Sequence, residues 1–195
     1  MAYAVLIGTA PGTYVHKRDA EAAYFTKQCA TVTEAEAEAE DEDQMPIVVY
    51  TDGACSNNGK ATAKAGVGVF WGDGHPKNVS RPVHGVATNN VAELEAVEDA
   101  LDAIADMRPL RRGGFRIATD SQYAIQCVTT WFDGWRARGW KTASGSPVKN
   151  IDLIRRIHDK LDALGTAVAL IHVRGHSGVP GNEAADRLAV CGAGL

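Results

Sequence analysis

The sequence predicts an α/β fold in which helices cover a mixed β-sheet. Three apolar runs bounded by turn residues come first in the main part of the chain, and helical and strand-like segments then alternate. This order of elements is typical of one sheet packed against helices. A second observation favours a partly parallel sheet, because two similar apolar runs, 47–51 and 115–119, are both followed by Asp after a final Thr.

The first three strands are predicted at Ile47–Thr51, Ala65–Trp71 and Val79–Val86, which are largely apolar. The stretch Asp52–Gly59 contains Asp-Gly and Asn-Asn-Gly and is predicted to be a loop. The sequence Gly-Asp-Gly-His-Pro at 72–76 predicts a turn between the second and third strands.

A long helix is predicted next, because apolar residues recur at spacings of three and four. These residues are Val91, Leu94, Val97, Leu101 and Ile104. The pattern ends before Pro109, and Phe115–Thr119 is predicted to be the fourth strand. Ser121 can then cap a helix that runs towards Trp131.

The rest of the domain is predicted to begin with short helices and a loop over residues 132–149. Asn150–Leu164 follows as a helix with one apolar face, Ala167–Val173 as a fifth strand and Gly181–Cys191 as a closing helix.

The composition allows one sizeable core and argues against several classes of protein. Of 195 residues, 45% are hydrophobic, but no apolar run approaches the roughly 20 residues that cross a bilayer. The short N-terminal apolar stretch lacks a basic flank, so no secretory signal is predicted. The four cysteines are scattered without a CxxC pair, which predicts reduced thiols in an intracellular protein of the cytoplasm or nucleus.

The net charge of −4 is unevenly distributed. Residues 1–43 hold three Lys/Arg and nine Asp/Glu, which gives −6, whereas residues 44–195 hold 17 and 15, which gives +2. The acidic run predicts a solvated linker at 34–45 between a small N-terminal segment, 1–33, and a main domain, 46–192. The whole-chain charge therefore does not exclude nucleic acid as the partner of the main domain.

Four carboxylates are candidate metal ligands: Asp52, Glu93, Asp120 and Asp186. Each was expected where a strand ends or a helix begins, and each alone has an ordinary alternative as a turn residue, helix-start acid or exposed acid. Together they indicate one edge of the sheet, where ligands bind in open α/β folds. Clustered carboxylates repel one another unless cations neutralise them, and oxygen ligands suit Mg²⁺ or Mn²⁺.

Residues 48–189 resemble a type I ribonuclease H, nearer to the eukaryotic than to the bacterial members. Five blocks carry the resemblance in the family's order, and they are Tyr50–Gly59, Thr88–Glu93, Thr119–Tyr123, Trp131–Thr142 and His176–Asp186. The resemblance implies a ribonuclease H-like fold with a five-stranded mixed sheet, whose first three strands are antiparallel and whose last two are parallel to the first. It also implies an endonuclease that hydrolyses the RNA strand of RNA–DNA hybrids with two Mg²⁺ ions, or with Mn²⁺, leaving 5′-phosphate and 3′-hydroxyl ends.

The family's catalytic roles carry over to the matching residues. Asp52 would bridge both ions, Asp186 would complete the site that activates the attacking water, and Glu93 and Asp120 would help hold the ion at the leaving oxygen. Two such ions, about 3.5–4 Å apart, can stabilise both oxygens of an in-line displacement. His176, in a glycine-rich loop, resembles a mobile proton-carrying histidine of the family, although a lone histidine is more often structural.

The same resemblance implies contacts with the substrate. Amide side chains suit the 2′-hydroxyl group, which both donates and accepts hydrogen bonds. The family's contacts with the minor groove and the sugars match Asn58, Asn89, Asn90 and Gln122. Its channel for the DNA strand matches Tyr123, Trp131 and Trp135, and its DNA-phosphate pocket matches Thr88 and Asn150. Asn182 matches an asparagine with a supporting role near the active site. Without the flanking match, the paired asparagines would be interpreted as turn and cap residues, and the tryptophans could be core residues.

Residues 131–160 hold seven Lys/Arg and three Asp/Glu, a local charge of +4 that suits phosphate contacts. The family commonly has an arginine two residues before Thr88, where this chain has Val86, so one bidentate phosphate contact is expected to be missing.

The segment 1–33 is either a degenerate hybrid-binding module, as eukaryotic relatives carry, or a small appended element. A monomer with no membrane partner is predicted. The alternative functions are a hybrid-binding protein with weak catalysis and another nuclease of the ribonuclease H-like superfamily.

Overall fold

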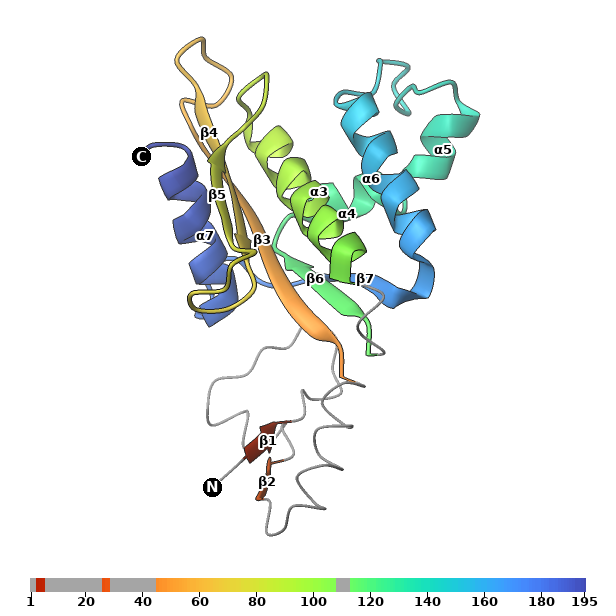
Figure 1. Cartoon of the computed structure of the whole chain (residues 1–195). Coiled ribbons are helices and arrows are strands. Elements are labelled where there is room, and N and C mark those ends of the chain that lie inside the picture. Colours follow the sequence, from red (N-terminus) through yellow and green to blue (C-terminus); the bar gives the residue numbers. More distant parts are fainter. Residues whose placement is uncertain (1–2, 6–25, 29–44, 108–112) are drawn as a thin grey trace.

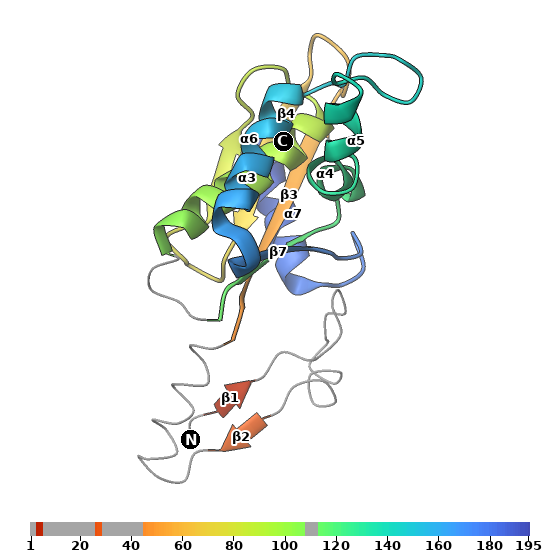
Figure 2. The same cartoon turned by 90° about the vertical axis from the view of Figure 1, so that its right-hand side faces the viewer.

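The main domain contains a five-stranded mixed sheet with helices on both faces (Figures 1 and 2). The computed structural model describes residues 3–5, 26–28, 45–107 and 113–195. The strands are β3 (Ile47–Ser56), β4 (Lys64–Phe70), β5 (Val79–Pro82), β6 (Phe115–Thr119) and β7 (Val168–His172), and their order in the sheet is β5-β4-β3-β6-β7. The pairs β3–β4 and β4–β5 are antiparallel, whereas β3–β6 and β6–β7 are parallel. The predicted fold class is therefore confirmed.

Five α-helices and one 3₁₀ turn lie within the described part of the chain. They are α3 (Asn89–Met107), α4 (Gln122–Val128), α5 (Phe132–Ala137), α6 (Ile151–Leu164), the 3₁₀ turn η2 (Gly165–Ala167) and α7 (Pro180–Gly192). Helix α3 packs on β3 and β4 and contacts α6, while α7 lies on the opposite face of the sheet and packs on β3, β4 and β5 (Figures 1 and 2). None of the helices in the described residues has the length and apolar character needed to cross a membrane.

The main hydrophobic core lies between the sheet and the layer of α3 and α6. Its fully buried members include Val49, Val67, Leu101, Ile117 and Ile154, which come from β3, β4, α3, β6 and α6. Four of the five residues in the apolar stripe predicted for α3 are buried, and the fifth is half-buried at the start of the helix. The stripe thus identified the face of α3 that covers the sheet.

The other face of the sheet receives α7 at unusually short range, because β4 presents glycines to it. A Cβ atom on Gly68 would lie 2.0 Å from the carbonyl oxygen of Ala185, and one on Gly66 would lie 2.1 Å from the amide nitrogen of Ala193. Only glycine leaves room for this contact between backbones.

Three predicted boundaries were wrong. Strand β3 continues beyond Thr51 to Ser56, because β4 keeps pairing with it through Asp52–Ser56, so the predicted loop begins later. Strand β5 ends at Pro82, because the N–H of Val83 still donates to Ala65 on β4 but that of His84 donates to Glu95 on α3. The predicted helix from Ser121 to Trp131 is divided between α4 and α5.

The N-terminal segment contributes two short strands, β1 (Tyr3–Val5) and β2 (Thr26–Gln28), which pair antiparallel. The rest of the predicted segment 1–33, and the predicted linker 34–45 except Met45, lie outside the described residues. The division of the chain into these parts therefore stays a prediction.

Candidate active site

Three of the predicted carboxylates meet where the parallel pairing of the inner strands β3 and β6 ends. Asp52 lies on β3, Glu93 lies near the start of α3, and Asp120 follows β6 directly. Each offers one carboxylate oxygen, and these three oxygens all lie within 4.8 Å of one another. Parallel pairing of β3 with β6 ends at Thr51 and Thr119, so the next residue of each strand is an aspartate at the same level of the sheet.

Glu93 joins the two aspartates because α3 touches the backbone of β3. A Cβ atom on Gly53 would lie 2.4 Å from the amide nitrogen of Glu93, so glycine is the residue that permits this approach. The backbone N–H of Gly53 also donates a 2.8 Å hydrogen bond to Oδ1 of Asp52. The Asp-Gly pair therefore lies within a strand, where its glycine allows α3 to pack closely. The turn that this pair predicted from the sequence does not occur here.

Asp186 reaches the cluster from the other face of the sheet. Asp52 is the cross-strand partner of Gly68, against which α7 packs, so the Asp52 side chain projects towards α7. The charge of Asp186 and a side-chain hydrogen bond with it help to raise the pKa of Asp52. Asp186 lies in the middle of α7, so its expected place at an element boundary was wrong, and the group within 4.8 Å does not include it.

The cluster carries more negative charge than its surroundings compensate. Asp52 and Glu93 are each only 6% exposed. Burial, followed by the charge of Asp120, raises the pKa of Asp52 from the ordinary value of 3.8 to about 7. Burial and the charges of Asp52 and Asp120 raise the pKa of Glu93 well above its usual range. Oε2 of Glu93 is buried without a hydrogen-bond partner, so the site fits a divalent cation that prefers oxygen ligands.

Asn182 lies beside the carboxylates, whereas His176 lies outside their group. Asn182 is buried on α7 and its Nδ2 donates a 3.3 Å hydrogen bond to Oδ2 of Asp120, while its Oδ1 has no partner. His176 is exposed in the loop between β7 and α7, where its φ of 49° is in the left-handed region. Asn182 can thus orient Asp120, and His176 is accessible to solvent.

Two asparagines from separate motifs meet beside Glu93. The Oδ1 atom of Asn58 accepts a 3.3 Å hydrogen bond from the backbone N–H of Asn89, and Nδ2 of Asn89 donates a 3.4 Å bond to Oε1 of Glu93. The hydroxyl of Thr88 accepts the N–H of Val91 at 3.2 Å and caps α3. The cap of α3 is thus Thr88 and not one of the paired asparagines. The side chains of Asn90 and Gln122 are exposed.

The aromatic residues predicted to line a channel form one continuous cluster. The ring centroids of Tyr123 and Trp131 are 6.4 Å apart, and those of Trp131 and Trp135 are 5.4 Å apart. Nδ2 of Asn150 donates a 3.3 Å hydrogen bond to the Tyr123 hydroxyl. Trp131 is 37% exposed and Trp135 only 8%, so the first offers a surface while the second belongs to the core.

A hollow of about 340 Å³ lies between the segment 83–88 and the start of α6. Its wall includes Val86 on one side and Asn150 on the other, with Glu95 and Arg156 also lining it. Val86 is 75% exposed, so the residue that stands in place of the family's arginine projects into solvent.

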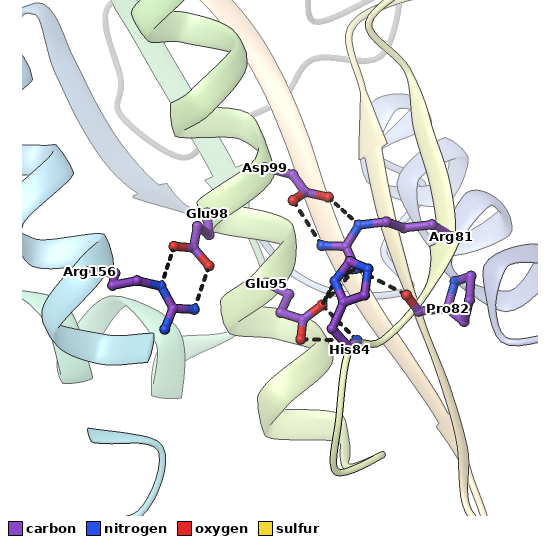
Figure 3. A network of polar contacts seen from close by, with 7 residues as sticks. All are labelled: Arg81, Pro82, His84, Glu95, Glu98, Asp99 and Arg156. Atoms are coloured by element: carbon purple, nitrogen blue, oxygen red, sulfur yellow. Dashed lines mark hydrogen bonds and ion pairs between the residues drawn. The ribbon is translucent and has the colours of Figure 1, made fainter. Parts of the chain in front are cut away.

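The sequence motifs did not reveal the ion pairs around Arg81, Glu95 and Asp99 (Figure 3). Their one signal in the sequence is the charge of α3, which holds six Asp/Glu and no Lys/Arg. Such an imbalance indicates that neighbouring elements supply the cations.

The family model described as RNase H matches residues 44–194. The chain belongs to the RNase H family. Among its curated RNase H relatives, Ribonuclease H1 of Rattus norvegicus is 43% identical over 147 residues, which are 75% of this chain and 50% of the relative. Ribonuclease H of Schizosaccharomyces pombe is 44% identical over 147 residues, covering 75% of this chain and 52% of the relative. The chain thus matches about half the length of these two relatives.

Solved structures agree with the RNase H assignment. LC9-RNase H1, a type 1 RNase H with the type 2 active-site motif, is 34% identical with a TM-score of 0.56, over 77% of this chain and 73% of that one. A foamy viral protease-reverse transcriptase in complex with an RNA/DNA hybrid is 26% identical with a TM-score of 0.62, over 77% of this chain and 20% of that one. The RNase H family is metal-dependent, and the carboxylate cluster described above could bind a metal.

Proposed function

We propose that this chain is an endonuclease that hydrolyses the RNA strand of RNA–DNA hybrids with two Mg²⁺ ions, leaving 5′-phosphate and 3′-hydroxyl ends. The observation that carries the proposal is the carboxylate group within 4.8 Å, in which a buried Glu93 oxygen has no partner. Membership of the RNase H family supports the same reaction. Mn²⁺ has the same preference for oxygen ligands and is the alternative ion.

Four carboxylates would hold the metal. Asp52 and Asp186 would hold the ion that activates the attacking water, and Asp52, Glu93 and Asp120 would hold the ion that stabilises the leaving 3′ oxygen. Bound divalent cations supply charge neutralisation and stabilise the attacking and leaving oxygens of an in-line displacement. The burial that raises the pKa of Asp52 and Glu93 in the metal-free site is what makes such neutralisation favourable.

Two further residues would assist the reaction. Asn182 would keep Asp120 in one orientation through the bond from its Nδ2. His176 would take up a proton through a ring nitrogen, because its exposed position on a loop gives it access to water and to the product. We propose both as supporting roles.

Recognition of the two strands would come from different parts of the site. Asn58, Asn89, Asn90 and Gln122 would contact the minor groove and the 2′-hydroxyl groups of the RNA. Tyr123, Trp131 and Trp135 would line the DNA sugars, and Thr88 and Asn150 would hold a DNA phosphate. The proximity of Asn58 and Asn89 to Glu93 supports the first assignment, since it sets the amides next to the reacting strand. We also propose that residues 46–192 form the catalytic domain and that the protein acts as a monomer.

A cleavage assay with a hybrid labelled on the RNA strand tests the proposal. The wild-type protein is expected to cut the hybrid with Mg²⁺ or Mn²⁺ and to be inactive in EDTA. Asp52→Asn is expected to lower cleavage by about 10³-fold or more, since loss of a bridging ligand costs several kcal/mol of transition-state stabilisation. Binding of the hybrid by this variant is expected to stay within about threefold of wild type. Asp73→Asn, at an exposed aspartate in the turn before β5, is the matched control.

Each alternative function has its own signature in this assay. A wild-type protein that binds the hybrid but does not cut it with either metal would be a hybrid-binding protein. Faster cleavage of duplex DNA than of the hybrid would identify another nuclease of the superfamily. Cleavage by Asp52→Asn at the wild-type rate would overturn the site assignment.

A further inference from the structure

An ion-pair cluster around the buried side chain of Glu95 joins strand β5 to helix α3 (Figure 3). Glu95 also lines the hollow beside Val86. Glu95 on α3 is only 6% exposed, and its Oε2 accepts a 2.6 Å hydrogen bond from Nη1 of Arg81. Asp99, one turn further along α3, accepts Nε and Nη2 of Arg81 at 2.8 Å each. Such forked contacts hold a guanidinium group in one orientation.

The same cluster holds the backbone of the segment that follows β5. Both carboxylate oxygens of Glu95 accept the backbone N–H of His84, at 3.2 Å each. Nη1 of Arg81 also donates to the carbonyl of Pro82 at 3.0 Å and lies 3.0 Å from Nδ1 of His84. Because an arginine can only donate, this ring nitrogen accepts in that contact. Glu95 and Arg81 therefore hold the beginning of the segment 83–88.

The segment 83–88 connects the cluster to residues that we assign to hybrid binding. It begins at Val83, whose N–H donates to the carbonyl of Ala65 on β4, and it ends at Thr88, which caps α3. The hollow separates this segment from Asn150, and Glu95 contributes to the hollow's lining. The segment thus leads from the ion-pair cluster, along the hollow, to Thr88.

We propose that Glu95, held by Arg81 and Asp99, is a positioning residue for hybrid binding. It fixes the segment 83–88 so that Thr88 and Asn150 receive one DNA phosphate between them. This inference rests on the proposed function. Fixing this segment matters in this chain because Val86 provides no cation that could draw the segment onto the phosphate. The segment 83–88 therefore has to be ordered before the hybrid binds.

The charges of the cluster predict an order among its variants. Glu95 is an anion close to the proposed phosphate site, and Arg81 compensates it at 2.6 Å. Removing Arg81 leaves a buried, uncompensated carboxylate next to the phosphate, whereas removing the charge of Glu95 leaves Arg81 paired with Asp99. Arg81→Gln is therefore expected to weaken hybrid binding more than Glu95→Gln.

Glu98 offers a matched control on the same helix. It is 12% exposed in its side chain and is bound by Arg156 and Lys160 of α6, on the side of α3 away from β5 (Figure 3). It makes a forked pair with Arg156 at 2.9 and 3.0 Å, which resembles the pair of Arg81 with Asp99. Glu98→Gln thus perturbs an ion pair of α3 without touching the contacts of His84.

The test measures affinity for a labelled RNA–DNA hybrid in EDTA, together with cleavage at saturating hybrid in Mg²⁺ and thermal unfolding. Glu95→Gln is expected to raise Kd about fivefold and Arg81→Gln about tenfold or more, while kcat stays within about twofold. Arg81→Lys should restore part of the affinity, because it keeps the charge. Glu98→Gln should not raise Kd, although its Tm falls as much as that of Glu95→Gln. The affinity of Glu95→Gln for the hybrid should fall with salt concentration at the wild-type slope, since the substitution removes no phosphate contact.

The proposed function and the positioning role of Glu95 would be overturned by different results. Wild-type protein that neither binds nor cuts the hybrid would overturn the proposed function, and this inference with it. Active wild-type protein with equal Kd for Glu95→Gln and Glu98→Gln would overturn the positioning role alone. A fall in kcat at unchanged Kd would also overturn it, because that result would assign Glu95 to the chemistry.

Discussion

Asp52→Asn is expected to stabilise the metal-free protein, although the same variant is expected to lose the proposed activity. Burial and then the charge of Asp120 raise the pKa of Asp52 from 3.8 to about 7 in the folded protein. Between these pH values the unfolded chain carries an ionised Asp52 and the folded chain a protonated one, so folding takes up a proton and stability falls as the pH rises. Above about pH 7 both states are ionised and the full penalty is present.

The magnitude follows from the difference between the two pKa values. A difference of about three, at about 1.4 kcal/mol for each pKa unit, sets an upper limit of about 4 kcal/mol. Local relaxation and water entry reduce the cost of a buried charge, so a gain of about 2 kcal/mol is the expected result for the variant. Asparagine keeps the oxygen that accepts the Gly53 N–H, and it replaces the other carboxylate oxygen with an uncharged NH₂ group.

Urea unfolding in EDTA at several pH values measures this effect. The variant and the wild type should have similar stability near pH 4, and the advantage of the variant should reach its full size by about pH 8. Mg²⁺ should then stabilise the wild type more than the variant, since only the wild type keeps all four carboxylates. Asp73→Asn serves as the exposed control. An advantage independent of pH, or a variant less stable than wild type at about pH 8, would refute the reasoning.

Two further predictions concern the substrate surface. Val86→Arg should tighten hybrid binding about five- to tenfold, because Val86 is 75% exposed beside the hollow. The salt dependence of binding should become steeper by the equivalent of about one phosphate contact. Val86→Gln, which adds length without charge, should change neither the affinity nor the salt dependence. Trp131→Ala should weaken hybrid binding several-fold with a small loss of stability, since its ring is partly exposed. Trp135→Ala should lower the free energy of unfolding, measured in urea, by about 3 kcal/mol or more, since that ring belongs to the core. Equal losses of stability in the two tryptophan variants would contradict this division.

Local sequence patterns identified most of the fold. The α3 stripe of Leu94, Val97, Leu101 and Ile104 is buried as its spacing predicted. The boundaries that were wrong depend on partners that a local pattern does not contain. Strand β3 extends to Ser56 only because β4 pairs with it there, although Asp-Gly and Asn-Asn-Gly are turn signals in isolation.

The candidate site, too, was predictable from the sequence only in part. The Thr-Asp ends of two similar strands indicated that Asp52 and Asp120 would meet, because parallel strands bring equivalent residues to one level. Nothing in the spacing showed that Asp186 approaches from the opposite face, since that depends on the glycines of β4 and the packing of α7. Glu95 was missed for a related reason: a charge on a helix is usually solvated, and its half-buried partner Arg81 lies on another element.

The contact of α3 with Gly53 has a consequence for the dynamics of the site. The amide of Glu93 lies against the backbone of a central strand, with no side chain between them to adjust the distance. The spacing of these ligands is therefore set by the same contacts that hold the whole sheet. In native-state hydrogen exchange, the amides of Asp52, Gly53 and Glu93 should open only with global unfolding, while the amides of the His176 loop should exchange through smaller, local openings. The part of the protein that would hold the metal is thus expected to be among its last parts to loosen.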